Sequence, residues 1–178
     1  MKKILTILWL CFCLGLTGCQ SKEEAMAETK EVSCKEAGIS FTLNGLWAES
    51  KDEGIDIETK EGQTVALSVV QKSTGSGIDI ICEDLTQTES GILVRMDDYI
   101  AYLQEQLKIA GEYNYSCGEV CTEKIYGNSY ETFTAVIPEW NGTQKYYIRR
   151  QDDTMIVMMI TVFGEDTLED ILALGKAL

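Results

Sequence analysis

The sequence predicts an α+β domain, an antiparallel sheet of about six strands flanked by helices. Short segments in which apolar and polar residues alternate, as in half-buried strands, fill most of the chain after Gly38. Two other segments, at 97–111 and 167–178, repeat apolar residues at helical spacing. Antiparallel strands with helices packed against them make an α+β domain. Turn pairs separate the strand candidates: Asn44-Gly45, Gly127-Asn128 and Asn141-Gly142.

The first strand candidates precede the first helix. Residues 39–43 alternate apolar and polar side chains up to the Asn44-Gly45 turn. Residues 55–59 and 64–70 are two further candidates on either side of a short polar link. The pattern of residues 78–82 (IDIIC) is ambiguous.

An amphipathic helix is expected next. Asp97 fits the N-cap position, and Gly111 is well placed just after the C-terminus. Between them, four apolar residues share one face of the helix, so that face is expected to pack on the sheet. They are Ile100, Leu103, Leu107 and Ala110.

More strands follow this helix. Residues 117–126, 129–139 and 143–150 are candidates, and Asn141-Gly142 is the strongest hairpin signal because both residues tolerate positive φ. Residues 155–163 (MIVMMITVF) are apolar on both faces, which is typical of a central strand covered on both sides. We therefore expect its methionines in the core: Met155, Met158 and Met159.

The chain is expected to close with a second helix. Thr167 and Asp170 fit a capping pattern at its start. Its apolar face would be formed by Leu168, Ile171, Leu172 and Leu178.

The amino terminus has the layout of a secretory signal. Lys2 and Lys3 precede a mostly apolar run from Ile4 to Leu16, which is short for a helix that spans a bilayer. The end of the run, Leu16-Thr17-Gly18-Cys19, resembles the bacterial lipobox. The resemblance implies that residues 1–18 are a lipoprotein signal peptide and that Cys19 carries a thioether-linked lipid. An ordinary cleaved signal, or an uncleaved anchor with an incidental cysteine, is the alternative.

The address implied by this resemblance is the extracytoplasmic face of the cell membrane, to which several acyl chains would hold the protein. Residues 19–36 are polar and contain few large apolar residues, so we expect the lipidated Cys19 and a flexible tether there. The folded domain is then expected over residues 37–178.

Seven cysteines occur in the chain. Cys11 and Cys13 would leave with the signal peptide, which leaves four besides Cys19: Cys34, Cys82, Cys117 and Cys121. An exported protein could join four cysteines in two disulfides, with three possible pairings, but free buried thiols are also common. Cys117 and Cys121 are too far apart to bond within one straight strand. A zinc site is not expected, because the chain has no His and the cysteines are scattered.

Charge and residue types exclude several classes of function. The formal net charge is −14, and loss of Lys2 and Lys3 would make it more negative, so nucleic acid is not an expected partner. Without His, a His-based catalytic triad is impossible. No phosphate-binding loop occurs, and no cofactor is expected. Four neighbouring acids lack calcium-loop spacing, so a solvated surface is favoured there over a weak cation site: Asp52, Glu53, Asp56 and Glu58.

The order of elements resembles the PsbP-like family. The resemblance rests on GISFTLNGLW at the start of the domain, the helix in the middle of the chain, the run IYGNSYETFTAVIPEWNGTQKYYIRR, and MIVMMITVF before a short final helix. In bacterial lipoproteins of this family a proline is usual near the position of Asn44. The resemblance covers roughly residues 37–178 and implies an α/β/α sandwich and a binding or assembly module that is not an enzyme. It supplies no catalytic residue.

Two hypotheses about function follow. The first is a binding module with a protein partner, in which amphipathic aromatic side chains form a contact surface: Trp47, Trp140, Tyr146 and Tyr147. Packing in the core or on the sheet is the alternative for these four residues. The second hypothesis is a hydrolase of envelope polymers that uses two facing carboxylates, one with a raised pKa.

Overall fold

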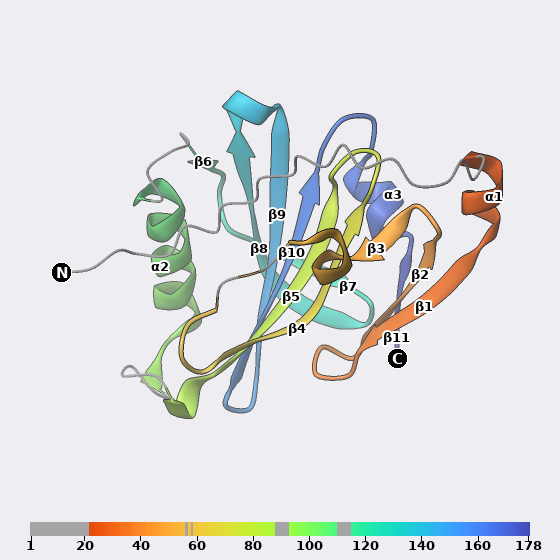
Figure 1. Cartoon of the computed structure of the whole chain (residues 1–178). Coiled ribbons are helices and arrows are strands. Elements are labelled where there is room, and N and C mark those ends of the chain that lie inside the picture. Colours follow the sequence, from red (N-terminus) through yellow and green to blue (C-terminus); the bar gives the residue numbers. More distant parts are fainter. Residues whose placement is uncertain (1–21, 56, 58, 88–92, 110–114) are drawn as a thin grey trace.

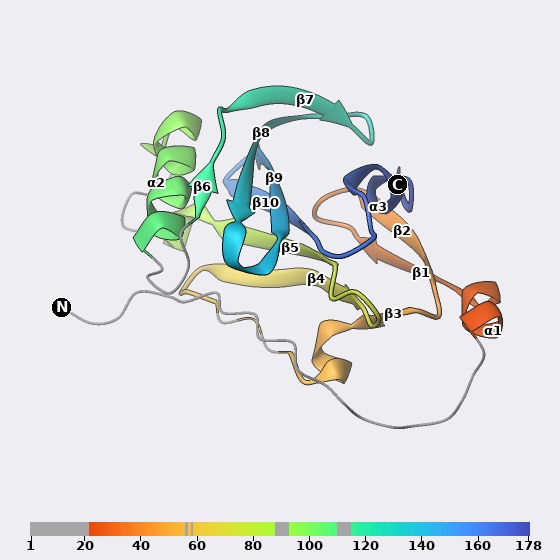
Figure 2. The ribbon, with the colours of Figure 1, turned by 90° about the horizontal axis from the view of Figure 1, so that it is seen from above.

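Two antiparallel sheets and a few helices make up the domain (Figures 1 and 2). The computed structural model describes residues 22–178, except 56, 58, 88–92 and 110–114. Helix α2 (Met96–Ile109) packs on one face of the large main sheet, and a small sheet with helix α3 (Leu168–Leu172) covers the other face. The α+β class is therefore confirmed, although one outer layer is mostly a sheet where the α/β/α prediction placed helices.

Within the described residues the main sheet has eight strands, whereas the sequence predicts about six. Its order is β3-β4-β5-β10-β9-β8-β6, and β7 also pairs with β8. The bounds are β3 (Trp47–Glu49), β4 (Gln63–Gln71), β5 (Gly77–Asp84), β6 (Ser116–Cys117), β7 (Cys121–Ile125), β8 (Asn128–Ile137), β9 (Gly142–Gln151) and β10 (Thr154–Val162).

The sequence does not predict β3, and two further differences have opposite effects on the number of strands. The candidate strand 117–126 is divided into β6 and β7, which pair with β8 in registers one residue apart, and residues 118–120 between them belong to no strand. The strand predicted at 55–59 is wrong, because Ile55, Ile57 and Thr59 lie outside any strand. The ambiguous segment 78–82 is a strand, in the interior of the sheet as part of β5.

Strand β10 lies in the interior of the main sheet, as its apolar sequence predicts. It pairs with β5 on one side and β9 on the other, and Met155, Met158 and Met159 are all buried. Met158 belongs to the cluster beneath the small sheet, whereas Met155 and Met159 face α2. Both faces of this strand are therefore core.

The small sheet consists of β1 (Thr29–Cys34), β2 (Ile39–Asn44) and β11 (Gly175–Ala177), in the order β1-β2-β11. Strand β1 lies inside the range expected to be a flexible tether, so that prediction is wrong for 29–34. β1 pairs with β2 along its whole length, although most of its side chains are exposed. An exposed edge strand can be polar, which is why its composition resembled a linker.

The helices agree with the sequence in their buried faces more than in their ends. Helix α2 begins at Met96, so Asp97 lies in its first turn and is not the N-cap. The buried side of α2 includes Ile100, with Leu103 and Leu107 partly buried against the same cluster, while Ala110 and Gly111 lie outside the described residues. Shorter helices are α1 (Lys22–Ala27), η1 (Ser50–Glu53), η2 (Leu85–Gln87) and η4 (Pro138–Trp140).

Helix α3 confirms the predicted cap and corrects the predicted length. The N–H of Asp170 donates to Thr167 Oγ1 at 3.1 Å, as in a capping motif. The helix ends at Leu172, and the chain continues into β11, so Leu178 is 64% exposed and does not belong to the apolar face. Among the described residues, no helix is long and apolar enough to cross a membrane.

The predicted Asn141-Gly142 hairpin forms, and its two residues contribute to it in different ways. Asn141 has a positive φ of 49° after helix η4, whereas Gly142 is already the first residue of β9 and does not share that conformation. A Cβ on Gly142 would lie 2.7 Å from Cδ1 of Phe163 and closer still to Cε1. Glycine is needed at 142 because the aromatic ring occupies the space.

We therefore expect Gly142→Ala to lower the free energy of unfolding by about 1–3 kcal/mol, since overpacking must displace the Phe163 ring. Urea unfolding of the purified protein measures the effect. Gly118→Ala is the matched control, because its Cβ would meet only Thr134 O at an ordinary 3.5 Å. Equal losses in the two variants would contradict the steric argument.

Candidate functional site

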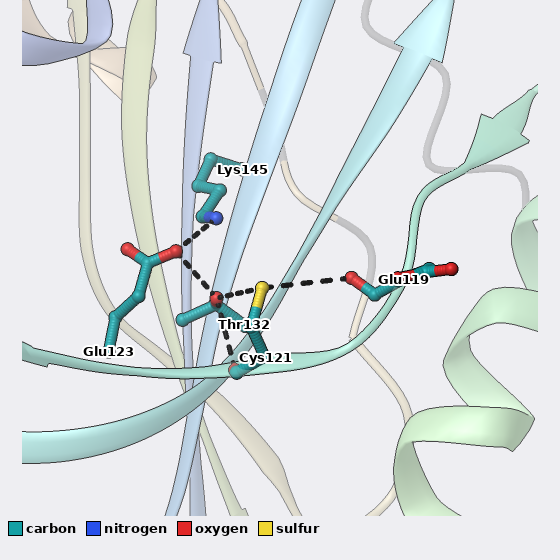
Figure 3. Close-up of polar contacts among 5 residues, drawn as sticks. All are labelled: Glu119, Cys121, Glu123, Thr132 and Lys145. Carbon is teal, nitrogen blue, oxygen red and sulfur yellow. Dashed lines mark hydrogen bonds and ion pairs between the residues drawn. The ribbon is translucent and has the colours of Figure 1, made fainter.

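Polar side chains from three adjacent strands meet on the face of the main sheet that the small sheet partly covers (Figure 3). Lys145 Nζ of β9 lies 2.5 Å from Glu123 Oε1 of β7, and Thr132 Oγ1 of β8 lies 2.9 Å from the same oxygen. The ammonium group also lies 5.8 Å from the centre of the Tyr147 ring. The group ties β7 to β9 across the strand between them.

The electrostatics of this group favour an ion pair. Burial raises the pKa of Glu123, but the hydrogen bonds from Lys145 and Thr132 outweigh it, and the net pKa is below its ordinary value. The carboxylate is thus held ionised beside a lysine whose side chain is only 13% exposed. Such a pair fixes strand positions, whereas a general acid needs a carboxyl that holds a proton near neutral pH. The nearby Cys121 is exposed, and its Sγ contacts Glu119 O at 3.9 Å.

A second polar group lies on the opposite face of the sheet, where α2 packs. Asp79 of β5 is 3% exposed, and Ser68 Oγ of β4 donates to its Oδ1 at 2.6 Å. Ser68 Oγ is also 2.5 Å from Ser50 Oγ. Burial raises the pKa of Asp79 to about 6, and the hydrogen bond from Ser68 opposes part of this shift. The hydrogen-bond partner that the described residues give Asp79 is a hydroxyl and not a second carboxylate.

More buried polar groups lie beside Asp79 on the same face. Tyr146 Oη donates to Gln144 Oε1 at 3.0 Å, and Gln144 Nε2 donates to Thr161 Oγ1 at 3.4 Å. The strand register places Met159 opposite both Tyr146 and Asp79. The face under α2 therefore combines an aromatic and aliphatic core with a strip of hydrogen-bonded polar side chains.

The raised pKa of Asp79 makes stability depend on pH. Because the folded protein favours the protonated carboxyl, this stabilisation is complete below the ordinary value of 3.8 and is lost as pH rises through about 6. In the wild type, the buried Asp79 should lower the free energy of unfolding by up to about 3 kcal/mol between pH 4 and 7. We expect this decrease to be absent from Asp79→Asn. Urea unfolding across this range measures it.

Asp152→Asn is the matched control for this pH profile. Asp152 is exposed, and Asn tolerates its positive φ of 53° equally well. The control should keep the wild-type difference between pH 4 and 7. If Asp79→Asn and wild type lost stability in parallel over this range, the buried position of Asp79 would be contradicted.

The aromatic contact surface predicted from the sequence is not assembled. Tyr146 and Tyr147 are 6% and 0% exposed, and they point to opposite faces of β9 because neighbouring residues in a strand alternate. Tyr146 stacks on Phe133 with ring centres 4.6 Å apart. Trp47 is partly buried against the cluster beneath the small sheet. The backbone of Trp140 lies in η4, and its side chain is outside the described residues, as is Cys19.

Some residues that matter in the structure had only a weak signal in the sequence. Asp79 is the single charged residue in an otherwise apolar stretch, IDIIC, and recognising that stretch as a central strand would have marked it as a buried acid. The approach of Cys34 to Cys82, described below, has no local signal. Of the four neighbouring acids, Asp52 and Glu53 lie in η1, and no group of metal-ligating side chains occurs among the described residues.

Comparisons with known proteins identify the fold. No family model matches the chain, and no curated protein shows significant sequence similarity to it. The solution structure of cyanobacterial PsbP (CyanoP) from Synechocystis sp. PCC 6803 matches with a TM-score of 0.53 and 12% identity, over 93% of this chain and 99% of that chain. The Ran-binding protein Mog1p of Saccharomyces cerevisiae has a TM-score of 0.45 at 12% identity, over 77% and 78% of the two chains. The match to CyanoP over nearly the whole of both chains shows a PsbP-like fold.

Proposed function

We propose that this protein is a lipid-anchored module on the extracytoplasmic face of the cell membrane that binds or assembles with another protein and is not an enzyme. The lipobox-like ending at Cys19 supports the anchor. The PsbP-like fold supports the module by analogy alone, since a fold does not fix a function.

The observation that carries the binding proposal is where apolar side chains are exposed. Four of the seven large, exposed apolar residues described lie between 93 and 120, on or near α2 and the neighbouring β6 edge of the main sheet: Leu93, Tyr102, Ile109 and Val120. Figures 1 and 2 both show α2 beside β6, and Gln104 Nε2 donates to Gly118 O at 3.3 Å between them. Lys60 Nζ donates to Tyr102 Oη at 2.6 Å, and the apolar side chains that stay exposed around this contact favour binding of a protein.

The interior polar groups give less support to the hydrolase alternative. Glu123 is held ionised by Lys145, and Asp79 is bonded to a serine. A glycosidase of the usual kind needs two carboxyl groups that face each other across the substrate. The alternative predicts that Asp79→Asn abolishes the turnover of envelope glycans, whereas the binding proposal predicts unchanged turnover.

Replacing Cys19 with Ser tests the anchor. We expect Cys19→Ser to lose incorporation of labelled fatty acid and to appear either outside the membrane fraction or as the longer unprocessed chain, because serine lacks the thiolate that accepts the lipid. Cell fractionation with metabolic lipid labelling measures this. Cys121→Ser, which changes an exposed thiol of the domain, should keep wild-type labelling. Undiminished labelling of Cys19→Ser would refute the anchor.

Photo-crosslinking in intact cells tests the binding surface. A photoreactive residue at Tyr102 or Ile109 on α2 should give one discrete crosslinked species, and the same residue at Thr42 should not. Thr42 is an exposed control on the small sheet, away from α2. Crosslinks of equal yield from all three positions, or from Thr42 alone, would contradict the proposed surface.

A further inference from the structure

Two cysteines from distant parts of the chain meet in the core. Cys34 is the last residue of β1 in the small sheet, and Cys82 lies in β5 of the main sheet. They are 1% and 9% exposed and belong to the same apolar cluster. Each thiol shifts the pKa of the other, so the two side chains are near neighbours in this cluster. Two neighbouring thiols from the two sheets, buried in one apolar cluster, are candidates for a disulfide that joins the sheets.

The turn after β1 encloses this pair. The N–H of Ala37 donates to Cys34 Sγ at 3.4 Å, and the thiol of Cys34 donates to Glu36 Oε2 at 3.6 Å. Arg149 donates from Nη2 to Ala37 O at 2.9 Å, which holds the turn against the main sheet. The strand register aligns Ile156 with both Arg149 and Cys82, so the guanidinium and the thiol project from the same face. The Cys34 thiol is therefore held by a backbone N–H and a carboxylate, and a guanidinium lies on the same face of the main sheet as Cys82.

We propose that Cys34 and Cys82 are a redox pair that closes into an intramolecular disulfide between the small sheet and the main sheet. The oxidant is a disulfide, either a small molecule or the active-site disulfide of a thiol oxidase. The Cys34 thiolate attacks one sulfur of the oxidant, which forms a mixed disulfide and releases one thiolate. Cys82 then loses its proton and attacks Cys34 Sγ, which releases the second thiolate. Two protein thiols are oxidised as one disulfide of the oxidant is reduced.

The electrostatics give the two sulfurs different roles. The hydrogen bond from Cys82 lowers the pKa of Cys34, with a smaller contribution from the N–H of Ala37. The same hydrogen bond, together with burial, raises the pKa of Cys82. The thiolate is the attacking form, and Cys34 Sγ already accepts the N–H of Ala37 at 3.4 Å, so we assign the first attack to Cys34 and the second to Cys82. Burial shields both, so the reaction needs the edge strand β1 to open or must occur while the domain folds.

The other two cysteines of the domain have different surroundings. Cys121 is exposed, and Cys117 is half-buried on the face of the sheet that α2 covers, whereas Cys34 and Cys82 lie on the opposite face. The structure records no contact between the Cys117 and Cys121 thiols among its described residues. Of the three possible pairings of four cysteines, the observed geometry thus favours Cys34 with Cys82.

Peptide mapping tests the proposal on the full-length protein. Cleavage after Lys and Arg places Cys34 in peptide 31–35, Cys82 in 73–95, and both Cys117 and Cys121 in 109–124. Cells are treated with N-ethylmaleimide before lysis, and the protein is digested without reductant. We expect a linked species of 31–35 with 73–95 that disappears on reduction. It should persist in Cys121→Ser and be absent from Cys34→Ser and from Cys82→Ser.

A second arm uses protein purified in detergent, reduced, freed of reductant and exposed to oxidised glutathione. Formation of the same link there supports the pair independently of where the protein lives. A link that forms in the purified protein but not in cells would support the redox pair and contradict the proposed extracytoplasmic location. Only the experiment in cells depends on that location. Recovery of Cys34 and Cys82 as separate adducts in both arms, or a link from either one to 109–124, would overturn the proposal.

Discussion

Replacing Phe41 with Ala should lower the free energy of unfolding by about 3–5 kcal/mol, because the site is fully buried and the cavity cannot collapse easily. Phe41 of β2 is 0% exposed and points from the small sheet toward the main sheet. Its ring meets Tyr126 edge to face with centres 6.0 Å apart. The loss is a large fraction of the roughly 5–15 kcal/mol that stabilises a typical domain.

Thr42→Ala is the matched control for Phe41→Ala. Thr42 is the next residue of β2, its side chain is exposed, and its N–H still donates to Leu174 O at 2.8 Å in the variant. We expect it to change stability by less than about 1 kcal/mol. Urea unfolding of both variants measures the difference, provided that the slope of unfolding free energy against urea concentration is the same in both. If Phe41→Ala were as stable as Thr42→Ala, the small sheet would not be docked on the main sheet as described.

The parts of the fold that the sequence predicts correctly are those with a local signal. The apolar run predicted at 155–163 is a buried strand up to Val162, and Thr167 caps α3, because both depend on neighbouring residues alone. β1 has no such signal. Its residues are mostly polar because only one of its edges is paired and little of it is covered, and what makes it a strand is the ladder to β2. Composition cannot separate this situation from a linker.

The predicted aromatic contact surface is wrong for Tyr146 and Tyr147, and the predicted sheet already implied that both would be buried. A sheet covered on both faces buries consecutive residues of an interior strand, so Tyr146 and Tyr147 had to point into opposite layers. Aromatic type alone suggested a surface, whereas position in the sheet indicated core. The exposed apolar residues Tyr102 and Ile109 lie on the outward side of α2 instead. The general lesson is that strand position outweighs residue type when both faces of a sheet are covered.

The contact of Cys34 with Cys82 could not be predicted, because it depends on how the small sheet docks. Four cysteines can be paired in three ways. Spacing along the chain does not show whether Cys34 bonds to Cys82, to Cys117 or to Cys121. The register does, since β1 brings Cys34 to the turn that Arg149 holds against the main sheet. Because the two cysteines are far apart in the sequence, a disulfide between them is expected to raise the free energy of unfolding strongly.

Reducing the Cys34–Cys82 disulfide should lower the free energy of unfolding by about 4 kcal/mol. The bond closes a loop of roughly 50 residues, and a cross-link of that span restricts the unfolded chain far more than the folded one. β1 is where the restriction matters in the folded state, because it pairs with β2 alone and most of its side chains are exposed. If Cys19 carries the lipid, β1 is the first strand after the anchor, and any pull on the anchor acts on it first.

Urea unfolding with and without dithiothreitol measures this effect on the oxidised protein. Wild type and the double variant Cys117→Ser/Cys121→Ser should both unfold at lower urea when reduced. The double variant Cys34→Ser/Cys82→Ser should be less stable from the start but insensitive to the reductant. If wild type with a mapped Cys34–Cys82 link unfolded at the same urea concentration under both conditions, the bond would not clamp the two sheets. The docking of β1 would then rest on other contacts, among them the packing of Val32, the Lys30–Glu49 ion pair and the Arg149 hydrogen bond.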